Sequence, residues 1–448
     1  MRSDKLRNLA AVRKARLLAA ALVIGTSGPA ASGAAETPPS IPEIGSPELA
    51  ALGPHAAGTR HLRITAPDRL DPFATLRQGG GISATRTLGL RIWYPARAGR
   101  AKGQAAPITY RASVSGEPGH PDPIFTVPGI ARADAAPAGA GFPVVVLSHG
   151  WGNDPAMLTW LGENLATKGY VVVAPEHREN YGDRAMVPAG MLARPLDIRL
   201  VLDRLRGGLL RTLADTRRIA LAGYSYGGYG VLTVAGGRLS AGSKALSAFP
   251  APVRAAYADT GPMASAIADP DIRAVVAIAP AGGDPGAPWG EEGLRGITAP
   301  LLVIAGTADE TVGWRTGPEA IFTRASRSDR HLLAFENAGH GIGTNPAPAA
   351  MRARLWDFDW FEDAVWRKPR INAISVHFIT AFLDWRLKGQ ASRAAYFDVP
   401  ASRSDIGGWT GPATPYDAVS KGGDNPTWRG FVKGHQRGLE LRHRPPEG

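Results

Sequence analysis

Short, uninterrupted apolar runs alternate with amphipathic segments through the centre of this chain. Runs of this kind, bounded by glycine, proline or polar residues, are typical of parallel strands that are buried on both faces. The runs are FPVVVLSHG (142–150), YVVVAP (170–175), RRIALAGYS (217–225), AVVAIAP (274–280), APLLVIAGTAD (299–309) and HLLAFENAGH (331–340).

The segments between these runs have helical spacing, most clearly at 156–169 and 193–207, and a closing helix is predicted at 371–387. Two further strands are predicted upstream, at 61–69 and 85–96. The Pro- and Gly-rich stretch 98–141 is predicted to be a long loop. Strands that alternate with helices indicate an α/β fold with a mainly parallel central sheet and helices on both faces.

The alternation of predicted strands and helices also predicts the domain organisation. One insertion separates the helix after the strand at 217–225 from the next strand, and the other follows that next strand. Both lie beyond the carboxyl ends of strands, where ligand-facing loops occur, and we expect them to form small caps. The aromatic residues near the end of the chain indicate an extension that packs on the domain. The expected parts are an N-terminal lead-in (36–84), a catalytic domain (85–390) with insertions at 237–272 and 281–297, and a C-terminal extension (391–448) with Trp409, Trp428 and Phe431.

The first 35 residues have the pattern of a cleavable signal peptide. A basic stretch precedes a short apolar run at 17–24, and small residues lead to Glu36. The apolar run is too short to cross a bilayer, and we find no later candidate. We therefore expect export to the periplasm or the medium, without a stable membrane anchor.

Composition narrows the function classes. The chain has 448 residues, 44% hydrophobic and 20% charged, and a formal net charge of +12, part of which lies in the leader. The sequence contains no basic run interleaved with aromatic residues, the pattern that would indicate nucleic-acid binding. The absence of cysteine excludes thiol nucleophiles and zinc–thiolate sites, and no histidine spacing typical of a metal site occurs. We predict neither a metal nor another cofactor.

The stretch ALAGYSYGGYG (220–230) is the strongest chemical signal. Gly223, Ser225 and Gly227 form a G-x-S-x-G motif between a predicted strand and a predicted helix. This context is typical of a nucleophile elbow, in which the serine takes a strained conformation and the flanking glycines avoid the neighbouring chain. Ser225 is therefore the predicted nucleophile.

A serine nucleophile needs a histidine base and an acid that orients it. Asp309 and His340 follow Ser225 in that order, and each ends a predicted strand on the same sheet edge as the serine. We predict a Ser225–His340–Asp309 triad. Its alternatives are Asp284 as the acid and, as the base, His149 or His177, both of which precede the serine.

The oxyanion of an acyl-transfer intermediate needs two fixed N–H donors. The residue after the nucleophile, Tyr226, supplies one predicted backbone donor. The loop LSHGWGN (147–153) supplies the other, which we assign to Trp151.

Residues 85–390 resemble the α/β-hydrolase superfamily, and within it the predicted dienelactone hydrolase group and the related platelet-activating-factor acetylhydrolase-like esterases. The resemblance implies a serine hydrolase that acts on small-molecule esters or lactones. True dienelactone hydrolases are shorter and use cysteine, so their substrate is not implied. The resemblance rests on RIWYPA, VVVLSHGWGN, YVVVAPEHREN, RPLDIRLVLDRL, ALAGYSYGG, PLLVIAGTADETV and ENAGHGIG.

Three other functions are compatible with the motifs. GYSYGG is close to the elbow of prolyl-oligopeptidase-type peptidases, although the residues that precede the catalytic domain lack propeller repeats. Cutinase-like polyester hydrolases share the fold. A binding protein that has lost catalysis is the third alternative, but such proteins usually lack a triad member.

Overall fold

The computed structural model describes residues 36–98, 106–177, 179, 183–283, 288–405, 428–432 and 434–447. The predicted signal peptide and the alternative acid Asp284 lie outside the described residues, as does Trp409.

Strands make up the centre of the fold. They are β1 (Ala56–Leu70), β2 (Ser83–Ala96), β3 (Pro107–Ser113), β4 (Ile124–Ala133), β5 (Phe142–Ser148), β6 (Val171–Glu176), β7 (Ala214–Tyr224), β8 (Ala274–Ile278), β9 (Leu301–Gly306), β10 (Arg330–Phe335) and β11 (Leu439–Arg444).

These strands form a single sheet in the order β11-β10-β9-β8-β7-β5-β6-β2-β1-β4-β3. The six strands from β6 to β10 in this order run parallel to one another. β2 joins them antiparallel beside β6, and β11 joins antiparallel beside β10. The sheet is therefore mainly parallel at its centre, as the continuous apolar runs predict.

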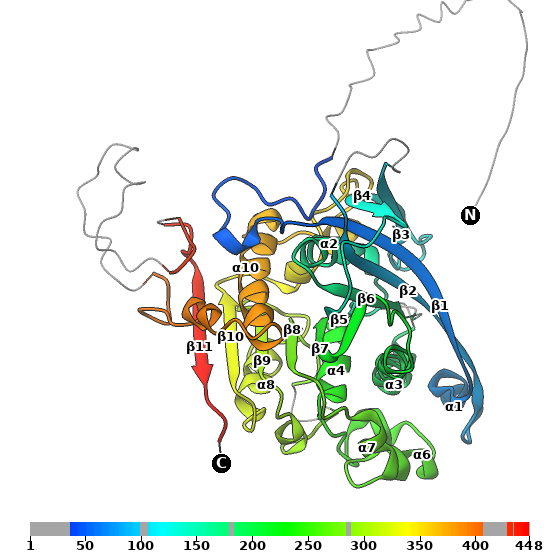
Figure 1. Cartoon of the computed structure of the whole chain (residues 1–448). Coiled ribbons are helices and arrows are strands. Elements are labelled where there is room, and N and C mark those ends of the chain that lie inside the picture. Colours follow the sequence, from blue (N-terminus) through cyan, green and yellow to red (C-terminus); the bar gives the residue numbers. More distant parts are fainter. Residues whose placement is uncertain are drawn as a thin grey trace, which may run out of the picture. The chain divides into compact units, whose positions relative to one another are not determined.

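Helices cover both faces of this sheet (Figure 1). They are α1 (Pro72–Gln78), α2 (Thr159–Thr167), α3 (Val187–Arg206), α4 (Tyr226–Val234), α5 (Lys244–Ser247), α6 (Ala251–Tyr257), α7 (Pro262–Ile267), α8 (Pro318–Arg324), α9 (Leu355–Asp359) and α10 (Lys368–Arg386).

Two hydrophobic cores lie on opposite faces because successive side chains of a strand point in opposite directions. Val145 and Leu147 of β5 join the core formed with α2 and α10. Val144 and Val146 join the core formed with α3, α4 and α8. Figure 1 shows these two groups of helices on either side of β5 to β9. Burial on both faces explains why each central strand contains an uninterrupted apolar run.

The stretch 98–141 differs from the prediction of a long loop, because it contains β3 and β4. Their burial alternates between exposed and buried positions. Such half-buried strands lack the continuous apolar run that identified the central strands.

Both ends of the described chain join the sheet. β1, within the lead-in 36–84, pairs with β2 over almost its whole length. β11, within the C-terminal extension, pairs with β10 from Arg330 to Phe335. Trp428 and Phe431 are buried against Phe378 of α10.

The first insertion, 237–272, holds α5, α6 and α7. The second, 281–297, holds a 3-10 helix at Gly293–Gly296. Across the part of the chain that the structure describes, we find no helix with both the length and the apolar character needed to cross a bilayer.

Candidate active site

Ser225 occupies the turn between β7 and α4. Its φ of 55° and ψ of −117° lie in a region that residues with a side chain rarely adopt. Backbone hydrogen bonds to the end of β8 and the residues that follow it hold this conformation. The Ser225 N–H donates to the Ile278 carbonyl at 2.8 Å, and the Ser225 carbonyl accepts from the Ala281 N–H at 3.1 Å. The backbone thus presents the hydroxyl above the end of the sheet.

The glycines of the motif allow this turn to pack closely. A β-carbon on Gly223 would lie 2.3 Å from the Gly227 carbonyl oxygen, and one on Gly227 would lie 2.1 Å from the Ser148 carbonyl oxygen. A β-carbon on Gly228 would lie 2.8 Å from Pro280. Only residues without a side chain fit at these approaches.

Ser225, His340 and Asp309 form one hydrogen-bonded chain. The His340 Nε2 atom lies 2.9 Å from Ser225 Oγ, and His340 Nδ1 lies 2.8 Å from Asp309 Oδ2. The other carboxylate oxygen, Oδ1, accepts the backbone N–H groups of Thr311 and Val312. These bonds fix the carboxylate as an acceptor for a proton on His340 Nδ1, which leaves Nε2 free to accept the serine proton.

The sheet explains why residues so far apart in sequence meet. β7, β8, β9 and β10 are consecutive parallel strands, so their carboxyl ends share one edge. Asp309 follows β9, and His340 follows β10 at the start of a 3-10 helix, His340–Gly343. Asp309 is buried, whereas the His340 side chain keeps 18% of its surface exposed.

The two predicted oxyanion donors lie on the adjoining turns. Trp151 follows β5, and β5 lies beside β7, with Ser148 opposite Gly223. Tyr226 is the first residue of α4, so its N–H has no acceptor within the helix. The Trp151 and Tyr226 rings pack edge to face with centroids 4.8 Å apart.

A cavity of about 960 Å³ opens beside Ser225 and His340. Much of its wall is aromatic, and the two insertions contribute few residues to it. The aromatic lining residues are Trp151, Tyr224, Tyr226, Trp356 and Trp360; the insertions contribute Ala245, Ala281, Gly282 and Pro288.

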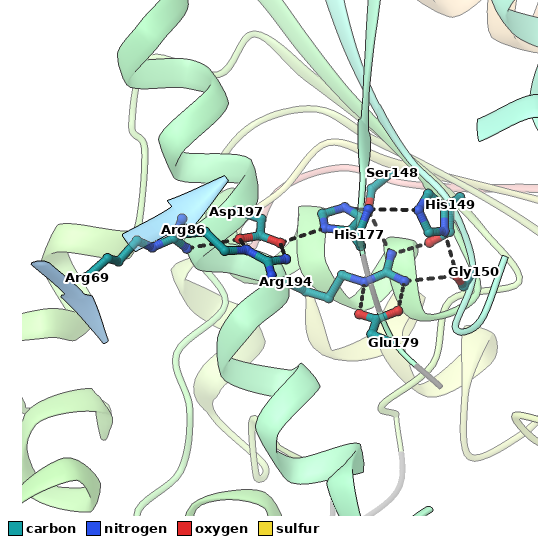
Figure 2. Close-up of polar contacts among 9 residues, drawn as sticks. All are labelled: Arg69, Arg86, Ser148, His149, Gly150, His177, Glu179, Arg194 and Asp197. Carbon is teal, nitrogen blue, oxygen red and sulfur yellow. Dashed lines mark hydrogen bonds and ion pairs between the residues drawn. The ribbon is translucent and has the colours of Figure 1, made fainter. Parts of the chain in front are cut away.

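The structure contains a second serine–histidine–aspartate chain, formed by Ser148, His177 and Asp197 (Figure 2). His177 Nε2 lies 3.0 Å from Ser148 Oγ, and His177 Nδ1 lies 3.0 Å from Asp197 Oδ2. All three residues are buried, and none of them lines the cavity. This chain has the connectivity of a triad but does not reach the cavity beside Ser225.

Burial and nearby charges determine the protonation states of this buried network. Although burial favours the neutral acid, the hydrogen bond from His177 and the charge of Arg86 hold the pKa of Asp197 below its usual range. Arg69 lies 3.3 Å from the same carboxylate. Burial, together with the nearby charge of Arg194, lowers the pKa of His177 to about 4. His177 is therefore neutral at pH 7 and donates its Nδ1 proton to an ionised Asp197.

His177 is one of the alternative bases that the sequence offers, but the sequence does not predict this network. Its only local signal is that His177 directly follows β6. Its partners Ser148 and Asp197 come from β5 and α3, and no local pattern predicts that they meet.

Comparisons with known proteins agree with the fold. A family model described as PET hydrolase-like matches residues 134–259, which contain β5, β6, β7 and the Ser225 turn. The cutinase est1 of Thermobifida alba is 25% identical over 198 residues, 44% of this chain and 52% of the cutinase. The match thus spans about half the length of that curated relative.

A solved structure extends the likeness beyond that region. The ferulic acid esterase from Streptomyces cinnamoneus covers 77% of this chain and 94% of its own, with 24% identity and a TM-score of 0.51. With the sheet order and the serine turn, this similarity identifies the α/β-hydrolase fold, and the prediction of that fold is confirmed.

Proposed function

We propose that this protein is a serine hydrolase that cleaves carboxylic esters or lactones through an acyl-enzyme. The observation that carries the proposal is the hydrogen-bonded chain Ser225–His340–Asp309 at the wall of an aromatic cavity. The PET hydrolase-like family model, the cutinase and the ferulic acid esterase support it, because their names describe hydrolases, one of them an esterase.

The proposed reaction begins when His340 Nε2 takes the Ser225 hydroxyl proton and Oγ attacks the ester carbonyl carbon. The carbonyl oxygen becomes an oxyanion, which the N–H groups of Trp151 and Tyr226 stabilise. His340 then gives the proton to the departing alkoxide, and the acyl group stays on Ser225. A water molecule repeats the sequence and releases the acid.

Asp309 holds the His340 ring in the orientation and tautomer that this proton transfer needs. It also stabilises the imidazolium that forms in the transition state. The strained Ser225 backbone keeps the nucleophile in place before substrate arrives, which reduces the reorganisation needed during reaction.

Polyester hydrolysis is the second candidate. The matched family and the cutinase favour it, and the cavity offers aromatic surface from Trp356 and Trp360. Peptidase activity has less support, because the described residues upstream of β2 form β1 and α1 instead of propeller blades.

We also propose that the chain is exported through cleavage near Glu36. The basic and apolar character of residues 1–35 supports this. Mass spectrometry of the protein from its native host should find a mature N-terminus near Glu36. An intact leader on cytoplasmic protein would contradict export.

The activity is tested with p-nitrophenyl butyrate and, in parallel, with an aminoacyl p-nitroanilide. The wild-type protein should cleave the ester in preference to the anilide. A fluorophosphonate should label Ser225, and Ser225→Ala should lower kcat by a factor on the order of 10⁴ or more. Full ester hydrolysis by Ser225→Ala would overturn the proposal.

A further inference from the structure

The carbonyl of Gly150 and the N–H of Trp151 belong to the same peptide group. Because that group is planar and trans, its C=O and N–H point in opposite directions, and fixing one fixes the other. The donors that hold the Gly150 carbonyl therefore determine where the Trp151 N–H points.

Two buried side chains donate to this carbonyl, which lies in the turn after β5 (149–153), here called the oxyanion turn. Arg194 Nη2 lies 2.9 Å from the Gly150 oxygen, and His149 Nδ1 lies 2.8 Å from it. The Asn153 N–H adds a longer bond of 3.3 Å that closes the turn. Figure 2 shows Arg194 and His149 converging on Gly150.

The proton on His149 can be assigned from its second contact. The His177 backbone N–H donates to His149 Nε2 at 3.1 Å, so Nε2 is the acceptor and Nδ1 carries the proton. Burial and the charge of Arg194 lower the pKa of His149 well below its usual range. The ring is therefore neutral and donates to Gly150.

Arg194 of α3 is completely buried, and all five of its N–H groups have acceptors. Nε and Nη2 donate to the Glu179 carboxylate, and Nη2 also donates to the Gly150 carbonyl. Nη1 donates to the His149 carbonyl and, at 3.1 Å, to Ser148 Oγ. The guanidinium thus holds two consecutive carbonyls of the turn.

The same guanidinium also reaches the second oxyanion residue. Its central carbon lies 5.5 Å from the centroid of the Tyr226 ring. Arg194 therefore contacts both of the turns that carry the proposed donors.

We propose that Arg194 and His149 are positioning residues for the oxyanion hole: they hold the Gly150 carbonyl so that the Trp151 N–H points into the cavity. Hydrogen bonds to the carbonyl also polarise the peptide group and strengthen its N–H as a donor. This inference rests on the proposed esterase function, because it assigns a role in stabilising that reaction's oxyanion.

Arg330 provides a matched control. It is also completely buried, donates to the carbonyls of Phe322, Ser326 and Ser328, and pairs with Glu447. It does not line the cavity. If kcat falls only because a buried arginine has been replaced, it should therefore fall equally in Arg330→Lys.

The test compares kcat, KM and the urea midpoint for Arg194→Lys, Arg330→Lys and the wild-type protein on p-nitrophenyl butyrate. Lysine keeps the charge but loses the planar fork of donors. Because removal of an oxyanion donor costs about 10²–10³ in kcat, misdirecting one should lower kcat about 10- to 100-fold and leave KM within about 2-fold. Affinity for a trifluoromethyl ketone, which forms a tetrahedral adduct, should fall with kcat. Arg330→Lys should lower the urea midpoint without this loss of kcat.

A kcat for Arg194→Lys within about 2-fold of the wild-type value, or an equal loss in Arg330→Lys, would overturn the inference. If Arg194→Lys does not fold, His149→Phe decides the question, since it removes the other donor: kcat should fall about tenfold with KM unchanged, and an unchanged kcat overturns the inference. Ester hydrolysis that survives Ser225→Ala would instead overturn the proposed function itself, and this inference with it.

Discussion

Gly227 lies directly against the carbonyl of Ser148, so the nucleophile turn and the oxyanion turn fit together only where a side chain is missing. A β-carbon on Gly227 would stand 2.1 Å from that oxygen. The contact joins the start of α4 to the end of β5, and so sets the distance between Ser225 and the Trp151 peptide.

We expect Gly227→Ala to separate these two turns. Overpacking of this kind costs about 1–3 kcal/mol of stability, and the displaced donor should lower kcat at least about tenfold. Urea unfolding and ester kinetics measure both effects. Gly81→Ala is the control, because a β-carbon there has no neighbour within 4 Å. A Gly227→Ala variant with wild-type kcat would show that the turns are not coupled.

Asp309→Asn should lower kcat by about 10⁴, because His340 would lose the acceptor that fixes its tautomer. The structure places Asp309 Oδ2 2.8 Å from His340 Nδ1, whereas Asp284 lies outside the described residues. Asp284→Asn should affect mainly KM. Kinetics of both variants on one small ester test the assignment, and a larger kcat loss in Asp284→Asn would transfer the acid role to that residue.

The cavity should favour short acyl groups. Residues from both insertions, including Ala245 and Pro288, contribute to its wall beside the aromatic side chains. We expect kcat/KM to be highest between acetate and octanoate in a series of p-nitrophenyl esters. A maximum at laurate or palmitate, or activation by a lipid interface, would contradict this expectation.

Stability should rise with pH between about 4 and about 6.5, the ordinary histidine pKa. Burial and the neighbouring His443 lower the pKa of His331 to about 3, and burial with the charge of Arg194 lowers that of His177 to about 4. In this range the unfolded chain binds protons that the folded protein excludes, so acid favours unfolding. Asp154 acts in the opposite direction, since burial raises its pKa to about 6.

Comparison with a variant isolates one of these histidines. Asp329, Arg386 and His443 are the charged or titratable groups around His331. In His331→Phe, the pH slope of the unfolding free energy should decrease by up to about 1.4 kcal/mol per pH unit, the value of one proton. Urea unfolding at several pH values gives the slope, and equal slopes in both proteins would show that His331 binds as many protons in the folded protein as in the unfolded chain.

Leu441 of β11 should contribute strongly to stability. It is 3% exposed and packs in the core shared with α10. Leu441→Ala should cost about 2–5 kcal/mol, the usual range for a buried leucine. Arg444→Ala, at an exposed position of the same strand, is the control. Equal urea midpoints for Leu441→Ala and the wild-type protein would mean that β11 does not hold the sheet edge.

The sequence predicted the central strands and the serine turn because each has a local signature. Burial on both faces gives β5, β7 and β9 an uninterrupted apolar run, and a strained turn requires Gly223 and Gly227. β3, β4 and β11 were missed because each is buried on one face, which leaves only a weak alternation. In β11 that alternation is visible, with Leu439 and Leu441 buried between polar residues.

The support around Gly150 could not be predicted in the same way. In the sequence, nothing distinguishes Arg194 from other arginines of an amphipathic helix. Only the packing of α3 against β5 brings it to the His149 and Gly150 carbonyls. Long-range contacts of this kind leave no periodic trace in the sequence.

The pairing of β11 with β10 also sets an order of events in the newly made chain. β10 ends at Phe335, and its partner begins at Leu439, so synthesis of residues 336–438 separates the two strands. Without β11, β10 would be the edge strand of the sheet, and an open edge invites pairing with other chains. Nascent protein that lacks β11 should therefore be a substrate for chaperones, and chains stopped before Leu439 should aggregate more readily than the finished protein.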